Sequence, residues 1–256
     1  MMNQTERLHF LISYMLQEKG EEQVIPKSFE ERFKMYRGLA NERPAKKISR
    51  EYLDVQDMFL RDYNKENIIN FKDLEPIDDA LYLWQGDITT LKIDAIVNAA
   101  NVDLIGCLIP NHNCIDNIIH TKAGLQLRLV CAKIIAKQGR KEAVGRAKIT
   151  DGYNLPASYI LHTVGPVVTG NKVSPLKRDL LKKCYTSCLQ VAEETGIESI
   201  AFCSISTGVF GYPKKEAAEA AIEAVKEYKT NEDSNIKVVF NVFDDEAYNT
   251  YENLLK

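Results

Sequence analysis

Apolar residues recur at the spacing of helices in the first eighty positions of the chain. Three groups of them are separated by polar stretches and by Pro44, and Pro26 followed by Ser28 and Glu31 is typical of a helix start. We favour three helices that form a cap packed on the rest of the chain, with an independent binding module as the alternative. The apolar positions of the predicted helices are Leu8, Leu11, Ile12, Tyr14, Met15, Leu16, Phe29, Phe33, Met35, Tyr36, Tyr52, Val55, Met58 and Phe59.

Beyond residue 80 the pattern changes to short apolar runs that alternate with helical segments. This alternation predicts an α/β fold in which helices cover a sheet, and ligands of such folds bind beyond the carboxyl ends of the strands. Strands are expected at residues 81–84, 95–97, 147–150, 159–164, 199–203 and 237–243, and helices at 115–137, 176–194, 214–228 and 246–255. We therefore expect a helical extension over residues 1–78 and an α/β domain over residues 79–256.

Composition and charge narrow the class of protein. The chain has 256 residues, of which 45% are hydrophobic, and a formal net charge of −3. It is long enough for a full core and too apolar to be disordered. The absence of a basic excess argues against a nucleic-acid or membrane-surface binding protein. The sequence has neither an apolar run of about 18 residues nor a secretory signal pattern at its start, so we expect a cytoplasmic protein with reduced thiols.

A cluster of Cys and His residues lies in the segment GCLIPNHNC. Cys107, His112 and Cys114 offer two thiolates and an imidazole, a donor set suited to tetrahedral Zn²⁺. Three protein ligands leave a fourth position for water or substrate, as in catalytic zinc sites. His120 is a candidate for a fourth ligand or for a residue behind the ligands, and three unrelated loop residues are the alternative. The remaining candidates fall in apolar segments and are expected in the core: Cys131, His162, Cys184, Cys188 and Cys203.

Polar side chains follow the first two predicted strands and begin the helix after them. Asp87 either accepts from an amine or a ribose hydroxyl or caps the next turn. Asn98 and Asn101 either bind hydroxyl groups or fill turn hydrogen bonds. Asp116 and Asn117 stand at the predicted helix start, where capping competes with activation of a water molecule.

The segment SISTGVFGYP, residues 204–213, connects a predicted strand to a predicted helix. Backbone N–H groups of such a loop, followed by a helix N-terminus, can converge on an anion. The segment has neither the Walker GKS/T pattern nor GxGxxG. Phosphate binding and an ordinary turn are therefore both open, and Phe210 and Tyr212 add aromatic faces that fit a sugar or a base.

Taken together, these segments resemble the macrodomain family, whose members bind ADP-ribose. Between residues 81 and 229, five segments occur in the same order as the motifs of the family: WQGDIT, DAIVNAAN, CIDNIIHTKAG, GRAKITDGYNLPASYILHTVGP and SISTGVFGYP. The Cys-His-Cys segment and the helical extension are similar to those of a zinc-dependent bacterial and fungal subclass of protein-ADP-ribose hydrolases. The resemblance implies a three-layer α/β/α macrodomain with a mixed central sheet, preceded by the helical extension.

The resemblance also assigns roles to residues. Adenine would be held by Asp87 and Ile88, and Zn²⁺ by Cys107, His112 and Cys114. The diphosphate would be bound by the main chain of Ser206, Thr207, Gly208, Val209 and Phe210. The remaining ADP-ribose contacts would come from Asn98, Asn101, Cys114, Ile115, Asp116 and Asn117. Within this set, the catalytic residues would be Asn101, Asp116 and Asn117.

The activity implied by the resemblance is zinc-dependent removal of mono-ADP-ribose from modified proteins, with an acidic-residue ester as the favoured linkage. Zinc would either activate water or orient the distal ribose. The implied partners are ADP-ribose, an ADP-ribosylated protein such as a lipoyl carrier protein of the glycine-cleavage type, and a functionally linked sirtuin-type ADP-ribosyltransferase. A non-catalytic ADP-ribose reader and an O-acetyl-ADP-ribose deacetylase are the alternatives.

Overall fold

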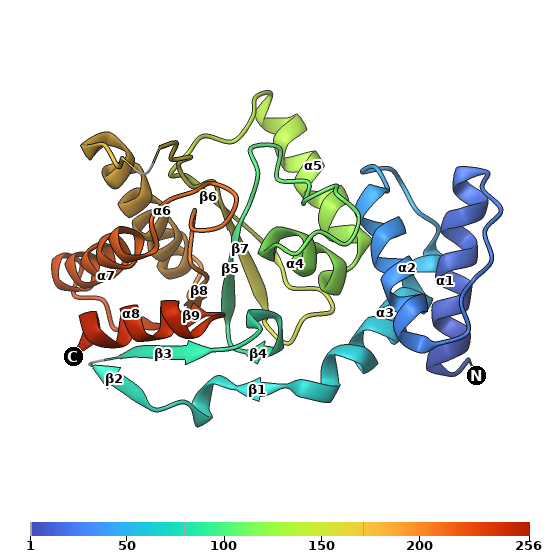
Figure 1. Ribbon diagram of the computed structural model, residues 1–256, viewed down its shortest axis with the longest axis horizontal. Helices are drawn as coiled ribbons and strands as arrows, with labels where there is room; N and C mark the ends of the chain where they lie inside the picture. Colours follow the sequence, from blue (N-terminus) through green and yellow to red (C-terminus); the bar gives the residue numbers. More distant parts are fainter. Residues whose placement is uncertain (1, 79, 171) are drawn as a thin grey trace.

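A mixed sheet forms the centre of the protein (Figure 1). The computed structural model describes residues 2–78, 80–170 and 172–256, and within them the seven strands of this sheet lie in the order β2-β3-β9-β8-β5-β7-β6. The strands from β3 to β7 in this order run parallel, and the two edge strands run antiparallel to their neighbours. Their bounds are β2 (Pro76–Asp78), β3 (Leu81–Gln85), β5 (Ala95–Ala99), β6 (Ala147–Asp151), β7 (Tyr159–Thr163), β8 (Ser199–Phe202) and β9 (Lys237–Val242).

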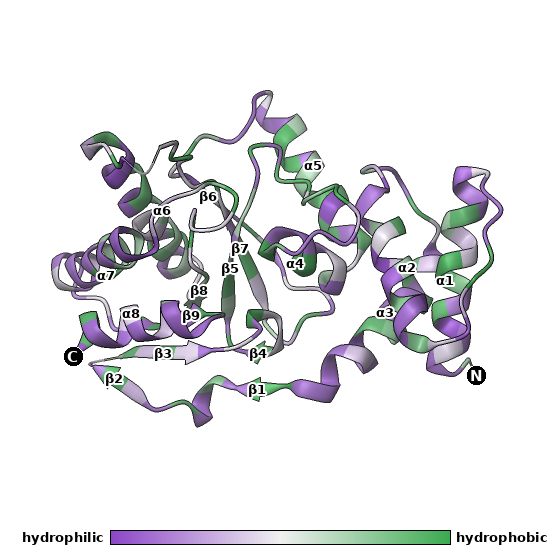
Figure 2. Ribbon diagram, in the orientation of Figure 1, coloured by the Kyte–Doolittle hydropathy of each residue, from purple (hydrophilic) through white to green (hydrophobic). Residues whose placement is uncertain are grey.

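Helices cover both faces of the sheet, as expected for parallel strands that are apolar along most of their length. On one face Asn98 of β5 contacts Asp116 of the first covering helix. On the other face the ring of Tyr185 packs against Phe202 of β8. Figure 2 shows β5 as hydrophobic along most of its length. The first face carries α4 (Ile115–Ala123) and α5 (Leu125–Gln138), and the second carries α6 (Pro175–Glu194), α7 (Lys214–Asn231) and α8 (Asp245–Leu255). The predicted three-layer α/β/α fold with a mixed sheet is confirmed.

The three helices of the N-terminal extension begin at polar caps. Asn3, Ser28 and Ser49 each accept a hydrogen bond from a backbone N–H in the first turn that follows, which satisfies a donor that has no partner within the helix. Ser28 accepts from Glu31, so the predicted helix start is confirmed. The helices are α1 (Gln4–Lys19), α2 (Phe29–Glu42) and α3 (Arg50–Asn64).

The extension has a hydrophobic core of its own. Leu8, Tyr36 and Phe59 are among its fully buried members, and Leu125 at the start of α5 is buried in the same cluster. A second cluster, which begins at Phe71, fills the space on both faces of the sheet. The extension therefore packs on the α4–α5 side of the α/β domain (Figure 1). The predicted boundary between residues 78 and 79 stays a prediction, because residue 79, like residue 1 at the start of the predicted extension, lies outside the described residues.

The helix predicted over residues 115–137 is wrong in one respect, because it is two helices. Gly124 separates α4 from α5 with a φ of 107°, a value that strains residues with a Cβ. A Cβ on Gly124 would lie 2.6 Å from Nε2 of Gln56 in α3. The break therefore lets the extension approach the α/β domain closely.

Short elements were not predicted, because two or three residues give too little periodicity. They are β1 (Ile69–Asn70) and β4 (Leu91–Lys92), which pair with each other, the edge strand β2, and the 3₁₀ turns η1 (Lys65–Asn67), η2 (Phe71–Asp73) and η3 (Ile88–Thr90). Among the helices that the structure describes, none combines the length and the apolar character that crossing a bilayer requires. The five residues expected in the core, Cys131, His162, Cys184, Cys188 and Cys203, are all buried.

Candidate functional site

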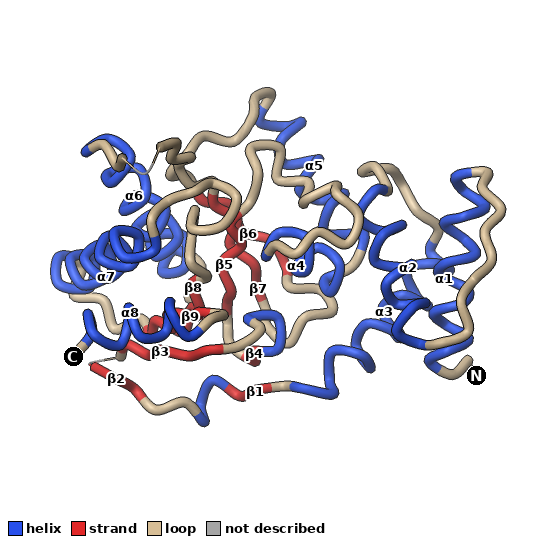
Figure 3. The backbone as a smooth tube through the Cα atoms, in the orientation of Figure 1, coloured by secondary structure: helices blue, strands red, loops and turns tan. Residues whose placement is uncertain are grey.

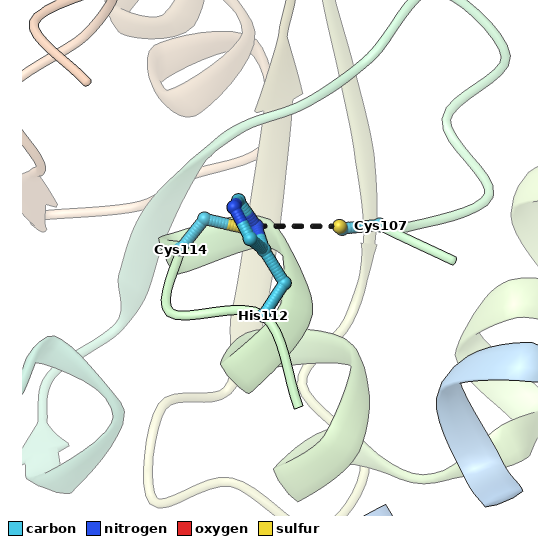
Figure 4. Close-up of side chains that lie close together, drawn as sticks. All are labelled: Cys107, His112 and Cys114. Carbon is cyan, nitrogen blue, oxygen red and sulfur yellow. Dashed lines mark hydrogen bonds between the residues drawn. The ribbon is translucent and has the colours of Figure 1, made fainter. Parts of the chain in front are cut away.

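The cysteine and histidine cluster lies in the long loop between β5 and α4 (Figure 3). The donor atoms of Cys107, His112 and Cys114 all lie within 4.8 Å of one another, with 3.5 Å between Sγ of Cys107 and Nδ1 of His112. Figure 4 shows the three side chains pointing toward a common point, with Cys107 approaching from the opposite side to the other two. Two thiols and one imidazole in this arrangement fit the donor set of Zn²⁺ and leave its fourth position free.

The chain reaches this arrangement through two unusual backbone positions. Gly106 has a φ of 80°, and a Cβ on it would lie 2.7 Å from the ring of His120. Asn111 has a φ of 55°, a conformation that Asn tolerates better than most residues. These positions fold the loop back so that residues five and seven apart in sequence meet. We refer below to residues 107–114 as the metal loop.

The carboxylate of Asp116 is buried directly behind the metal loop. Its Oδ1 accepts a hydrogen bond of 2.8 Å from Nδ2 of Asn98, and its Oδ2 accepts one of 3.2 Å from Nδ2 of Asn101. Burial raises the pKa of Asp116 to about 6, against the opposing effect of these amides and of Arg128. The structure thus joins three of the predicted site residues into one hydrogen-bonded group that fixes the orientation of a carboxylate.

Asn98 links Asp116 to His162 and fixes the tautomer of that histidine. Nδ2 of Asn98 also lies 3.2 Å from Nδ1 of His162, and Nε2 of His162 lies 3.0 Å from Oγ1 of Thr150. Because the amide nitrogen can only donate, Nδ1 accepts and Nε2 carries the proton. Burial lowers the pKa of His162 to about 4, which keeps the ring neutral. Asn98 is fully buried, so its amide fixes Asp116 and His162 from within the core.

His120 lies beside Asp116, and its donor atoms do not join those of the predicted zinc ligands. Its donor atoms group with Cys131 and His162 in the described structure, and its Nε2 lies 3.6 Å from Oδ1 of Asp116, beyond hydrogen-bond distance. Burial, with a smaller effect of His162 and Arg128, lowers the pKa of His120 well below its usual range. Both nitrogens of His162 are already engaged with Asn98 and Thr150. This second group is therefore a buried polar cluster of the core.

Asn117 holds the metal loop from the first turn of α4. Its Nδ2 donates to the carbonyl oxygen of Ile109 at 3.0 Å and lies 3.5 Å from that of Cys107. Its Oδ1 accepts a hydrogen bond from Arg37, and the side chain is fully buried. Asn101, by contrast, is partly exposed and donates to the carbonyl oxygen of Gly106. Of these two predicted site residues, Asn117 has both side-chain polar atoms engaged, the nitrogen by the metal loop and the oxygen by Arg37 of α2.

Cys114 is the residue before α4, and Ile115 is the first residue of that helix. Both are partly exposed, so both remain open to a ligand. Burial and the nearby Cys107 raise the pKa of the Cys114 thiol to about 12, against a hydrogen bond from the backbone of Asn117. A bound cation would favour the thiolate over the thiol.

Asp87 and Ile88 follow β3 at the same edge of the sheet. Oδ1 of Asp87 accepts from the backbone N–H of Thr89 at 3.0 Å and caps η3, and Oδ2 accepts from Nζ of Lys122 at 2.9 Å. Burial alone would raise the pKa of Asp87, but the opposing effects of Lys122 and Thr89 are together larger. The pKa is therefore below its usual value, and the carboxylate is charged at neutral pH. Its side chain keeps 37% of its exposure, so the carboxylate is partly accessible, whereas Ile88 is buried and offers only its main chain.

The segment after β8 presents main-chain donors. The backbone N–H groups of Gly208, Val209 and Phe210 have no acceptor within the described part of the chain. Ser206 has a φ of 68° and is buried, and Thr207 donates through Oγ1 to the carbonyl oxygen of Ser204. A run of free N–H groups before the N-terminus of α7 can bind an anion.

Close packing beneath this loop depends on Gly165. A Cβ there would lie 2.1 Å from Oγ of Ser206, so only glycine lets the Ser206 side chain fit under the loop. The carboxyl ends of β3, β5 and β8 thus bring the predicted binding segments to one edge of the sheet, where ligands of α/β proteins bind.

Sequence reasoning missed the residues that fix the site from other elements. Arg37 of α2 donates to Asn117 and to the carbonyl oxygen of His112, and Arg128 of α5 donates to the carbonyl oxygen of Ile105. Lys122 pairs with Asp87. Arg128 interrupts an apolar helical pattern, LQLRLVCAKII, and that interruption could have marked it. Arg37 contacts residues about 80 positions away, and no local pattern signals such a contact.

Comparisons with known proteins agree with this geometry. The Macro domain family pattern matches residues 97–221. The chain is 56% identical over 249 residues to a protein-ADP-ribose hydrolase of Staphylococcus aureus, covering 96% of this chain and 94% of that one, and 46% identical over 261 residues to a protein-ADP-ribose hydrolase of Treponema medium, covering 99% of this chain and 100% of that one.

A solved structure shows the same architecture. The Trypanosoma brucei macrodomain in complex with ADP-ribose is 31% identical in sequence and superimposes with a TM-score of 0.67, over 82% of this chain and 92% of that chain. Identity at these levels across nearly the full length, together with a shared fold, is evidence of common descent. The chain therefore belongs to the macrodomain family.

Proposed function

We propose that the chain is a zinc-dependent hydrolase that removes mono-ADP-ribose from modified proteins and releases ADP-ribose. The observation that carries the proposal is the convergence of three zinc-type donor atoms within 4.8 Å, in the loop that leads to the buried carboxylate of Asp116. The relatives named protein-ADP-ribose hydrolases support the reaction class. A protein that only binds ADP-ribose has no need of such a metal triad.

The nucleotide is held along the carboxyl edge of the sheet. Asp87 accepts from the adenine amine through Oδ2 while Oδ1 remains bound to Thr89. The free N–H groups of Gly208, Val209 and Phe210 bind the diphosphate. This arrangement directs the distal ribose toward Asn101, Asp116 and the metal loop.

Hydrolysis breaks the bond between C1″ of the distal ribose and the acceptor oxygen, with oxocarbenium character at C1″. The oxygen of a water molecule forms the new bond to C1″ and this water releases a proton to solvent, while the acceptor leaves as a carboxylate when the linkage is an acidic-residue ester. Asp116, held in one orientation by Asn98 and Asn101, positions this water. Zinc on Cys107, His112 and Cys114 would supply Lewis-acid chemistry, by orienting a ribose oxygen or by lowering the pKa of bound water.

The proposal extends to the setting of the reaction. We place the enzyme in the cytoplasm, because all six cysteines are free thiols, which suits a reducing compartment. The acceptor class is an ADP-ribosylated carrier protein of the lipoyl type, modified by a sirtuin-type ADP-ribosyltransferase. An ADP-ribosylated lipoyl carrier protein and an acceptor modified on glutamate are therefore the two substrates to compare.

The test measures bound metal and turnover in the same preparation. We expect about one zinc per chain, and free ADP-ribose released from a protein modified on acidic residues. Cys114→Ala should abolish both, whereas Cys188→Ala, a matched cysteine buried on the other side of the sheet, should retain both. Turnover by a zinc-free Cys107→Ala/Cys114→Ala protein would overturn the zinc mechanism. Tight ADP-ribose binding without turnover would indicate a reader, and release of acetate from O-acetyl-ADP-ribose alone would indicate a deacetylase.

A further inference from the structure

Helix α2 of the extension lies against the metal loop. Nε of Arg37 donates to Oδ1 of Asn117 at 2.9 Å, and Nη2 of Arg37 donates to the carbonyl oxygen of His112 at 2.7 Å. Asn117 in turn donates to the carbonyl oxygen of Ile109. The Arg37 guanidinium therefore binds both the main chain of His112, a predicted metal ligand, and the side-chain amide of Asn117, which binds another part of the loop.

A second side chain of α2 continues this contact one turn later. Oδ1 of Asn41 accepts from the backbone N–H of Asn111 at 3.0 Å, and its Nδ2 donates to Oγ1 of Thr121 at 3.0 Å. Asn41 is 1% exposed, so its amide is fixed between the loop and α4. Between Arg37 and Asn41, Gly38 allows the close approach, because a Cβ there would lie 3.0 Å from Nδ2 of Asn111.

The carboxyl end of α2 is fixed from the α/β domain. Nη1 of the buried Arg128 donates to the carbonyl oxygens of Ala40 and Asn41 at 2.8 Å each, and to that of Arg43. These are carbonyl groups at the end of the helix, which lack partners within it. Nε of the same guanidinium donates to the carbonyl oxygen of Ile105 at 2.6 Å. The segment just before the metal loop and the end of α2 therefore share one anchor.

We infer that helix α2 is a built-in part of the metal site and that Arg37 is a positioning residue, which sets the main chain at His112 and the side chain of Asn117. The inference rests on the proposed zinc-dependent function. Groups that orient metal ligands without touching the metal typically change metal affinity by about 10- to 100-fold when they are removed. The N-terminal extension thus acts on the zinc site itself, in addition to covering the face of α4 and α5.

The test compares Arg37→Ala with Arg50→Ala in the full-length protein. Arg50 is an exposed arginine of α3 that pairs with Asp54. Arg50→Ala therefore removes the same type of side chain from the same extension. Zinc affinity is measured by competition with a coloured chelator. Hydrogen exchange of the amides of residues 106–114 is measured on zinc-free protein, so that it reports the loop without the metal.

We expect Arg37→Ala to weaken zinc affinity by about 10-fold or more and to speed amide exchange in the loop, with Arg50→Ala unchanged in both. Arg37→Lys keeps the charge but offers a point donor in place of a planar fork, so its zinc affinity should stay lowered. ADP-ribose affinity should change less than about threefold, because the adenine and diphosphate contacts come from other loops.

The outcomes separate this inference from the proposed function. Equal zinc affinity and equal exchange in Arg37→Ala and Arg50→Ala would overturn the positioning role and leave the zinc proposal standing. Wild-type protein that takes up no zinc would overturn the zinc proposal. If the protein takes up no zinc and loop exchange is also unchanged in Arg37→Ala, the inference is refuted as well. If it takes up no zinc but loop exchange is faster in Arg37→Ala, Arg37 orders the loop but has no metal site to position.

Discussion

At the scale of single residues, one buried amide decides how two other side chains behave. Both hydrogens of the Asn98 amide are used, one by Asp116 and one by His162. The histidine can accept only because its other nitrogen donates to Thr150. Four side chains from β5, β6, β7 and α4 therefore form one chain of hydrogen bonds, in which Asn98 donates to Asp116 on one side and to His162 on the other. A carboxylate held this way is fixed before any substrate arrives.

Replacing this amide should impair turnover more than binding. Asn98→Ala leaves Oδ1 of Asp116 and Nδ1 of His162 without their donor, and we expect a stability loss of about 1–3 kcal/mol. ADP-ribose release should fall by about 10- to 100-fold, because the carboxylate loses its fixed orientation, while ADP-ribose affinity stays within a few-fold. The measurements are urea unfolding, release of ADP-ribose from a modified protein, and calorimetric titration.

Thr150→Val provides the matched control for that variant. It removes the other hydrogen bond of His162 but none of the contacts of Asp116. Its stability should fall while its turnover remains near that of the wild type. If both variants lose turnover in proportion to their stability, Asn98 has no positioning role.

The neutral state of His162 makes the fold sensitive to acid. Its pKa is lowered to about 4 by burial, whereas a histidine in an unfolded chain titrates near 6.5. Between these two pKa values the unfolded chain binds a proton that the folded protein does not bind. The contribution of neutral His162 to the free energy of unfolding is therefore full above pH 6.5 and is lost as the pH falls toward 4. The difference of about 2.5 pKa units corresponds to a loss on the order of 3 kcal/mol.

This pH dependence is measured by urea unfolding of zinc-free protein at pH 7.5 and pH 5. We expect the wild-type stability to drop between these values, and the drop to be smaller in His162→Gln. His9→Gln, which changes an exposed histidine of α1, should keep the wild-type drop. An equal drop in all three proteins would contradict the role of His162.

At the scale of elements, the long periodic segments were predictable and the contacts between them were not. The three helices of the extension and all six predicted strands are present, because each carries enough apolar positions at one spacing. The break at Gly124 was missed, since α4 and α5 continue one apolar pattern and the reason for the break is the approach of Gln56 from α3. Tertiary packing, which has no local signature, produced this difference.

The same distinction applies to the candidate site. The Cys-His-Cys cluster could be found from its density, and its three donor atoms do converge. Asp116 was found as a residue at a helix start, but its burial between two amides is a property of the folded sheet. The interpretation of Asn117 as a ribose contact could not include its hydrogen bonds to the metal loop and to Arg37, because those partners come from a separate loop and a separate helix.

At the scale of the whole molecule, nucleotide contacts and metal ligands come from different parts of the chain. The adenine and diphosphate segments follow β3 and β8, whereas the metal loop follows β5 and is held by α2 and α4 (Figure 1). The net charge of −3 is compatible with binding a diphosphate, because backbone N–H groups supply the donors. Changes at one end of the ligand should therefore leave the other end intact.

Asp87→Ala tests this separation. The variant loses a charged acceptor, a change worth about 1.5–3 kcal/mol for a hydrogen bond to a charged group, so ADP-ribose should bind about 10- to 100-fold more weakly. Zinc content should equal that of the wild type, because the hydrogen bonds of Asp87 go to Thr89 and Lys122 and not to the metal loop. Asp87→Asn, which can still accept from Thr89, should show a smaller loss of affinity.

Titration calorimetry with ADP-ribose and metal analysis of the same samples provide the measurement. Asp179→Ala, which removes an exposed aspartate from α6, is the control for the change in net charge and should alter neither quantity. Normal ADP-ribose affinity in Asp87→Ala would refute the adenine assignment. Loss of zinc from that variant would instead show that the two ends of the site are coupled, and the metal loop would then have to be understood as part of the nucleotide cleft rather than as a unit supported by α2.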